Sequence, residues 1–160
     1  MKRALCFIVL IAMAVTLWVG CQAEPEETVP YDVQVLLGAT GASVTLPSDV
    51  GFEEQKSELN DFFGRGSSGE WCIIVNRSDK EGFTFEEYCS ETASANNAAE
   101  VLKDEAGEPY FTYMEGGYRF YAAVREGKEN YYCVVFYCFN EVWDYYQDDF
   151  AKWAATITVK

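Results

Sequence analysis

Histidine is missing from this sequence of 160 residues. Its absence removes the commonest general base and the usual sets of metal ligands from any candidate active site. Basic residues are also few, because 12 lysines and arginines stand against 26 aspartates and glutamates, giving a formal net charge of −14 at pH 7. No cluster of lysines and arginines interrupts this acidity. Nucleic acid and polyphosphates are therefore excluded as expected partners, and the sequence predicts neither a metal nor a cofactor.

An apolar run long enough for a permanent membrane span is lacking as well. The chain opens with a basic segment at residues 1–3 and then continues without charge from Ala4 to Val19. A helix needs about 20 apolar residues to cross a bilayer. A basic segment followed by a shorter apolar one is instead typical of a secretory signal peptide, which we predict over residues 1–20.

The end of this segment resembles the lipobox of bacterial lipoproteins. In that motif a small residue precedes a cysteine whose thiol receives a diacylglyceryl group, and Val19, Gly20 and Cys21 follow the pattern. Trp18 departs from it, because the family usually places an aliphatic residue three positions before the cysteine, whereas Leu17 is four before. The resemblance implies that Cys21 is a lipid-modified N-terminus, which would anchor the protein to the cell membrane on its extracytoplasmic side. An uncleaved anchor and ordinary signal cleavage are the alternatives.

The residues from Cys21 onward divide into a tether and one domain. Proline and glutamate dominate residues 22–30, so we predict a flexible tether over residues 21–30 and a single globular domain over residues 31–160. Hydrophobic residues make up 49% of the chain and aromatic residues 16%, which is too much for a disordered segment. Loss of the two basic residues in the signal peptide takes the net charge to −16. A solvated surface is the simplest explanation of this acidity, and binding of a cation or a basic partner is the alternative.

Four cysteines fall within the predicted domain: Cys72, Cys89, Cys133 and Cys138. An even number of cysteines in an exported domain indicates disulfides. Three sets of pairings exist, and the spacing does not choose among them. Free buried thiols are the alternative, because cysteine also packs as a small apolar residue. A zinc site is not predicted, since the spacing contains no CxxC and the chain has no histidine.

The first half of the domain predicts two strands, a turn and a helix. Residues 42–47 alternate and end at a proline, and residues 71–76 form an apolar, β-branched run, so both are predicted strands. Residues 64–69 contain three glycines and predict a hairpin or loop, because a phosphate-binding loop would open a helix rather than a strand. A helix should begin after Thr84, which forms a capping box with Glu87.

The second half predicts an antiparallel meander and a second helix. Strands joined by short turns are expected at residues 100–103, 110–114, 118–125 and 130–139. The last of these is apolar on both faces, so helices should cover the sheet on both sides. In a helix expected over residues 140–154, one core-facing stripe holds Trp143, Tyr146, Phe150 and Trp153. A final strand at residues 156–159 would close the sheet. The predicted fold class is α+β, an antiparallel β-sheet flanked by helices.

This order of elements resembles the PsbP-like fold. The resemblance rests on the strand ending at Leu46-Pro47, the strand at residues 71–76, the capped helix at residues 83–88, the tyrosine-rich meander and the C-terminal helix leading into residues 155–157. That superfamily includes the PsbP subunit of photosystem II, a Ran-binding nuclear-import factor and bacterial lipoproteins of the DcrB type. The resemblance implies a three-layer α/β/α sandwich and binding or accessory roles. It carries over no site residue, because it is a pattern of elements without a diagnostic motif.

No catalytic constellation emerges from the remaining candidates. Ser78-Asp79-Lys80 lacks the Ser-x-x-Lys spacing, and Cys133 has no histidine to form its thiolate. The adjacent carboxylates at residues 86–87 and 148–149 diverge by about 100° on a helix, so neither pair converges on one ligand.

We therefore expect a binding or accessory domain rather than an enzyme. It would be tethered to the membrane, and its partner would be an envelope protein or a small ligand. A small hydrolase or thiol oxidoreductase is one alternative. A solute-capture protein is another, and it would need a deep, aromatic-lined cavity between sheet and helix.

Overall fold

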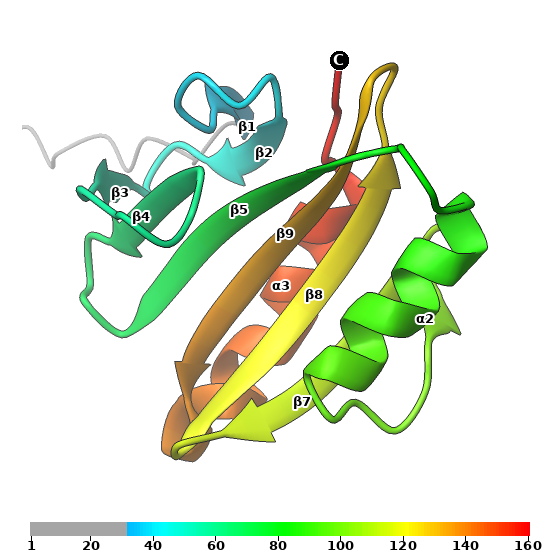
Figure 1. The fold of residues 1–160 in the computed structure, drawn as a ribbon. Helices are drawn as coiled ribbons and strands as arrows, with labels where there is room; N and C mark the ends of the chain where they lie inside the picture. Colours follow the sequence, from blue (N-terminus) through cyan, green and yellow to red (C-terminus); the bar gives the residue numbers. More distant parts are fainter. Residues whose placement is uncertain (1–31) are drawn as a thin grey trace, which may run out of the picture.

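The computed structural model describes residues 32–160, so the predicted signal peptide, Cys21 and the tether lie outside the described part of the chain. The elements are, in chain order, β1 (Asp32–Leu36), β2 (Ser43–Pro47), β3 (Phe52–Glu54), β4 (Phe62–Gly66), β5 (Trp71–Asp79), α2 (Phe85–Ala95), β6 (Leu102–Lys103), β7 (Pro109–Glu115), β8 (Tyr118–Glu126), β9 (Asn130–Phe139), the 3-10 turn η1 (Asn140–Val142) and α3 (Trp143–Ala155) (Figure 1).

Seven of the strands form one antiparallel sheet in the order β3-β4-β5-β9-β8-β7-β6. The long strands β5, β9 and β8 form its centre, with nine, ten and nine residues. Strands β7, β8 and β9 are consecutive along the chain and adjacent in the sheet, which confirms the predicted meander. Strands β1 and β2 pair with each other in a separate hairpin.

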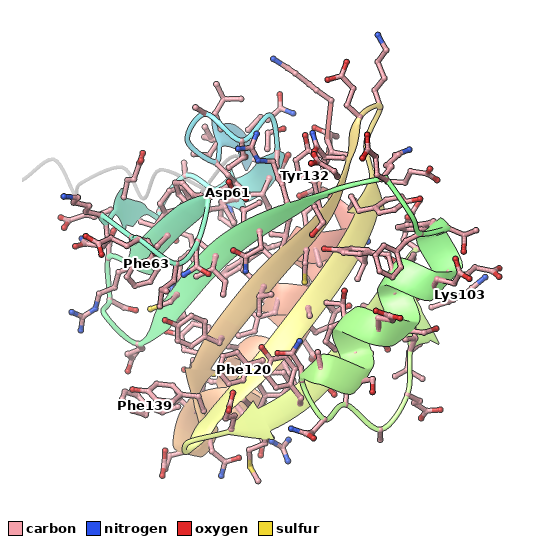
Figure 2. The ribbon with its side chains drawn as sticks, viewed as in Figure 1. Asp61, Phe63, Lys103, Phe120, Tyr132 and Phe139 are labelled. Atoms are coloured by element: carbon pink, nitrogen blue, oxygen red, sulfur yellow. The ribbon has the colours of Figure 1, made fainter. Side chains whose placement is uncertain are left out.

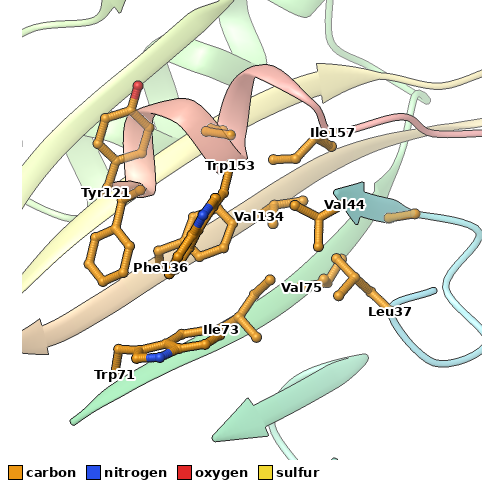
Figure 3. Close-up of a cluster of buried hydrophobic side chains, with 14 of the residues drawn as sticks. Leu37, Val44, Trp71, Ile73, Val75, Tyr121, Val134, Phe136, Trp153 and Ile157 are labelled. Atoms are coloured by element: carbon orange, nitrogen blue, oxygen red, sulfur yellow. The ribbon is translucent and has the colours of Figure 1, made fainter. Parts of the chain in front are cut away.

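The central strand β9 buries side chains on both of its faces, as its alternation predicts. Val134 and Phe136 belong to a core that includes residues of α3 and of the β1–β2 hairpin. Cys133 and Val135 belong to a second core, to which α2 contributes Cys89. Figure 3 shows part of the first core, where the rings of β9 and α3 meet side chains of β5. The sheet therefore lies between α2 on one face and α3 with the hairpin on the other.

The aromatic stripe of α3 packs onto the sheet, which confirms the predicted second helix. Trp143, Phe150 and Trp153 are buried, and the predicted first turn of the helix is the 3-10 turn η1. The Phe150 ring stacks on Phe136 at 5.5 Å between centroids, and Trp153 lies 5.1 Å from Trp71. Rings at these distances contribute attraction beyond the burial of their area, so α3 is held along its length.

The start of α2 also agrees with the prediction. The amide of Glu87 donates to the Thr84 hydroxyl at 3.3 Å, and the amide of Thr84 donates to the Glu87 carboxylate at 2.8 Å. These two bonds make the reciprocal capping box. The first turn of the helix then packs Phe85 and Tyr88 against Tyr131 of β9.

The glycine-rich segment forms the predicted hairpin, but Gly64 and Gly66 belong to strand β4 and the turn is confined to residues 67–70. A Cβ atom on Gly66 would lie 2.3 Å from the Trp71 indole, so this glycine leaves room for a core ring. The expected final strand does not join the large sheet, because Thr158 forms an isolated bridge with Ser43 of β2 instead. Strands β1, β3 and β4 were not predicted.

Candidate binding groove

Helix α2 is too short to cover its face of the sheet. Its 11 residues span about 16 Å, whereas the ten residues of β9 span about 33 Å. The covered part of β9 lies around Cys133 and Val135, while Tyr137 and Phe139 lie beyond the core under α2. Figure 1 shows the consequence, since α2 lies over β7 and β8 and leaves β5 open on the same side.

A groove of about 940 Å³ occupies the uncovered part of this face. Its floor comes from β4, β5, β8 and β9, and a loop at residues 56–60 forms one wall. Aromatic and apolar side chains dominate the lining: Leu59, Phe63, Ile74, Tyr118, Phe120, Tyr137 and Phe139. Leu59 at the rim is 92% exposed and Phe139 is 49% exposed, so both apolar side chains are accessible from solvent. Figure 2 shows Phe63, Phe120 and Phe139 on this side of the sheet.

A ladder of rings crosses the strands on the groove floor. Register places Tyr113 opposite Phe120, Phe120 opposite Tyr137, Tyr137 opposite Cys72 and Cys72 opposite Arg65. The first two ring pairs are stacked, with centroids 4.4 Å and 5.1 Å apart. Stacked neighbours cover each other's faces, so the rings turn their edges toward the groove. Ring edges carry partial positive charge and attract the faces of other aromatic rings.

The wall of the groove is held in place by side-chain hydrogen bonds. The Ser57 hydroxyl accepts from the amides of Leu59 and Asn60 at 3.2 Å and 3.0 Å. At the end of the loop, Asp61 accepts from the backbone amide of Arg77 at 2.7 Å and pairs with its guanidinium at 3.0 Å. These contacts fix the loop to β5 and leave the apolar side chain of Leu59 exposed at the rim.

Charges at the groove are balanced. Lys56 and Arg65 line it together with Glu58 and Glu70, and the Glu70 carboxylate accepts a hydrogen bond of 2.7 Å from the Tyr146 hydroxyl. The groove therefore carries no net charge on a strongly acidic protein.

The Cys72 thiol and the Tyr137 phenol, which lie opposite each other on the groove floor, are neutral. Burial raises the pKa of the Cys72 thiol, although the hydrogen bond with Tyr137 and the charge of Arg65 act in the other direction. Burial likewise raises the pKa of Tyr137. The floor of the groove around Cys72 and Tyr137 is thus uncharged, and the Cys72 thiol is not an activated nucleophile.

The four cysteines are free thiols and lie in three different environments. Cys72 lines the groove, Cys89 and Cys133 lie in the core under α2, and Cys138 lies in the core under α3. Burial raises the pKa of Cys133 to about 12 and those of Cys89 and Cys138 to about 11. Thiols with such values are poor nucleophiles at neutral pH.

The other candidate residues have structural contacts. Lys80 pairs with Glu126 at 2.6 Å, Glu87 caps α2, and Asp149 pairs with Lys152 at 3.3 Å. Within residues 32–160, no three potential ligands among Cys, Asp and Glu come together as a metal site. The helices in this range are also too short or too polar to cross a bilayer.

A second hollow of about 600 Å³ lies at the sheet edge beside α3. Tyr110 and Tyr121 line it and stack at 4.9 Å, and Ala151 and Lys152 contribute the helical side. A solute-capture protein would need a deep, aromatic-lined cavity between sheet and helix. This hollow is lined by two tyrosines, but it is open to solvent at the edge of the sheet. The cores under α2 and α3 consist of packed side chains.

Comparison with known proteins adds information on the fold. No protein-family model and no curated protein sequence matches the chain. The solution structure of cyanobacterial PsbP from Synechocystis superposes with a TM-score of 0.54 at 12% identity, covering 89% of this chain and 99% of that one. The fold is PsbP-like. The predicted α+β architecture is thereby confirmed, but at this identity the PsbP-like fold transfers no site residue.

Sequence reasoning missed the groove residues of β4, β8 and the 56–60 loop. Phe63, Phe120 and Leu59 were not singled out, because each looks like an ordinary core residue in a strand or a lone apolar residue in a loop. The signal that could have indicated the groove is a difference in length. The meander strands carry apolar side chains over a greater length than a helix of 11 residues can cover.

Proposed function

We propose that this protein is a membrane-tethered extracytoplasmic lipoprotein whose domain binds a protein partner through the groove on the open half of its sheet. The tether follows from the signal peptide and from Cys21, and the resemblance to DcrB-type lipoproteins agrees with it. The groove carries the binding role, because exposed apolar surface of this kind marks interaction sites on soluble domains.

The shape of the groove favours a protein segment over a small solute. Small-ligand sites enclose most of the ligand surface, whereas this groove is open along one side. Its ring edges and the exposed Leu59 and Phe139 suit apolar or aromatic side chains of a partner. The net charge of −16 after loss of the signal peptide would steer basic residues toward the domain and repel acidic ones. The expected partner segment therefore has aromatic or apolar side chains flanked by lysine or arginine.

The binding role is tested with paired surface variants of the full chain in its native cells. Leu59→Ser and Phe139→Ser remove apolar side chains from the groove rim, and Tyr145→Ser is the matched control, because Tyr145 is 85% exposed on α3 outside the groove lining. After in-cell cross-linking, the rim variants should lose a partner by at least about tenfold, as expected for hot-spot residues. The control variant should retain it.

Alkylation of Cys72 provides a second readout at the same site. A partner seated in the groove should protect this thiol, which lies on the groove floor. The binding proposal fails if the rim variants capture the same proteins as the control, or if Cys72 is alkylated equally fast with the partner bound.

The tether is tested separately through Cys21. Metabolic labelling with a fatty acid should mark the wild-type protein but not Cys21→Ser, and the intact mass of the wild type should match a chain that begins at an acylated Cys21. A wild-type protein without label would show an uncleaved anchor or ordinary signal cleavage instead.

A further inference from the structure

Contacts at the start of α2 fix its register on β9. The ring of Phe85 lies 5.6 Å from that of Tyr131, and the ring of Tyr88 lies 5.0 Å from it. Four residues along a helix advance about 6 Å, and two residues along a strand advance about 6.6 Å. One turn after Phe85 the helix therefore reaches Cys89, and two residues after Tyr131 the strand reaches Cys133.

Burial agrees with this register. Cys89 and Ala93 are the buried residues of α2, and both belong to the cluster that contains Cys133 and Val135 of β9. The proximity of the two thiols also shows in their chemistry, since Cys89 adds to the burial effect that raises the pKa of Cys133. Cys89 and Cys133 therefore lie in the same buried cluster between the helix and the sheet.

The sheet separates the other cysteines. Cys138 faces the α3 core, whereas Cys72 and Cys133 face the opposite side and Cys89 lies in the α2 core there, so Cys138 cannot reach any of these three. Cys72 lies opposite Tyr137, four residues along β9 from Cys133, which is about 13 Å. A disulfide needs Cα atoms within about 7 Å.

We infer that Cys89 and Cys133 form a disulfide when the protein meets a disulfide oxidant such as oxidised glutathione, while Cys72 and Cys138 stay thiols. Both S–H bonds break and one S–S bond forms. The two protons and two electrons pass to the oxidant, whose S–S bond breaks to give two thiols. The bond would fasten α2 to the central strand of the sheet. An extracytoplasmic location would supply the oxidising surroundings.

The test refolds the full chain from denaturant in a mixture of oxidised and reduced glutathione, so burial of the thiols sets no kinetic barrier. Free thiols are then alkylated and the tryptic peptides are analysed by mass spectrometry. We expect a bridged pair of peptides, residues 81–103 with residues 129–152. Because the second peptide holds both Cys133 and Cys138, Cys138→Ala serves as the control that keeps the bridge, and Cys133→Ala should abolish it.

Thermal unfolding gives an independent readout. The bridge closes a loop of more than 40 residues, so oxidation should raise the Tm of the wild type and of Cys138→Ala by roughly 10 °C. Oxidation should leave the Tm of Cys133→Ala unchanged. The inference is overturned if all four thiols are alkylated after refolding, or if the bridge contains Cys72 or Cys138.

Discussion

Replacement of Arg125 by methionine should destabilise the domain severely. Within residues 32–160, Arg125 is the only charged residue that is buried. It is 6% exposed. One guanidinium nitrogen donates to the carbonyls of Val124 and Pro109 at 2.9 Å and 3.4 Å. The other donates to the carbonyl of Ala154 at 2.8 Å and lies 3.6 Å from the carboxylate of Asp104. A single side chain thus joins β8, the start of β7, the turn before it and the end of α3.

The expected loss follows from these contacts. A hydrogen bond from a charged donor contributes about 1.5–3 kcal/mol, and two of the four contacts are shorter than 3 Å. Methionine keeps much of the apolar packing of the arginine stem. Asp104 still accepts hydrogen bonds from two backbone amides at 2.9 Å, so the free-energy cost of leaving its carboxylate without Arg125 is moderate. We expect a loss of about 3 kcal/mol, at the lower end for breaking a buried pair, and a fall in Tm of about 10 °C for a domain of about 130 residues.

Urea unfolding followed by circular dichroism measures this loss. The matched control is Lys152→Met, because Lys152 forms an exposed pair with Asp149 that should contribute less than about 1 kcal/mol. The slope of the unfolding curve should stay constant, so that the midpoint alone reports the change. The reasoning is refuted if Arg125→Met unfolds within about 1 kcal/mol of the Lys152→Met control.

Three further predictions follow from single contacts. In native protein, maleimide should label Cys72 before the other three cysteines of the domain. The labelling should still be slower than that of an exposed thiol, because burial raises the pKa of Cys72. Labelling of all four cysteines at the same rate would contradict the described burial. Thr84→Ala should cost about 1 kcal/mol in urea unfolding through loss of the α2 cap, whereas an unchanged midpoint would show that the cap is dispensable. The hydrogen bond from Arg77 holds the pKa of Asp61 below its usual range, so the pair stabilises above the unfolded pKa of about 3.9 and loses this effect as pH falls through the folded value. Wild type should therefore lose more stability than Asp61→Asn between about pH 5 and about pH 3, and parallel pH curves would count against the pair.

Local signals predicted the parts of the fold that depend on neighbouring residues. Thr84 and Glu87 are three residues apart, and their reciprocal bonds define where α2 begins. The alternation of β9 predicted cover on both faces, because a strand with apolar side chains on both sides must be buried between two layers.

Predictions that depended on distant residues were wrong or missing. Gly66 resembled a turn residue, but its role is to admit the indole of Trp71, a contact across the hairpin. The C-terminal segment pairs with β2 through two backbone hydrogen bonds between Ser43 and Thr158, 115 residues apart. The groove arises from the different lengths of α2 and β9, which sequence periodicity does not compare.

The sheet ends on two very short strands, and this limits its tendency to aggregate. β3 has three residues and β6 has two, so neither end strand offers a long template to another chain, and β6 covers the start of β7 at Pro109 and Tyr110. The 104–108 turn holds β6 beside β7, and Asp104 organises that turn while facing Arg125. Loss of Arg125 would therefore do more than lower the free energy of unfolding. It would loosen the cover of β7 and turn a protected edge of an aromatic-rich sheet into a site for intermolecular β-pairing.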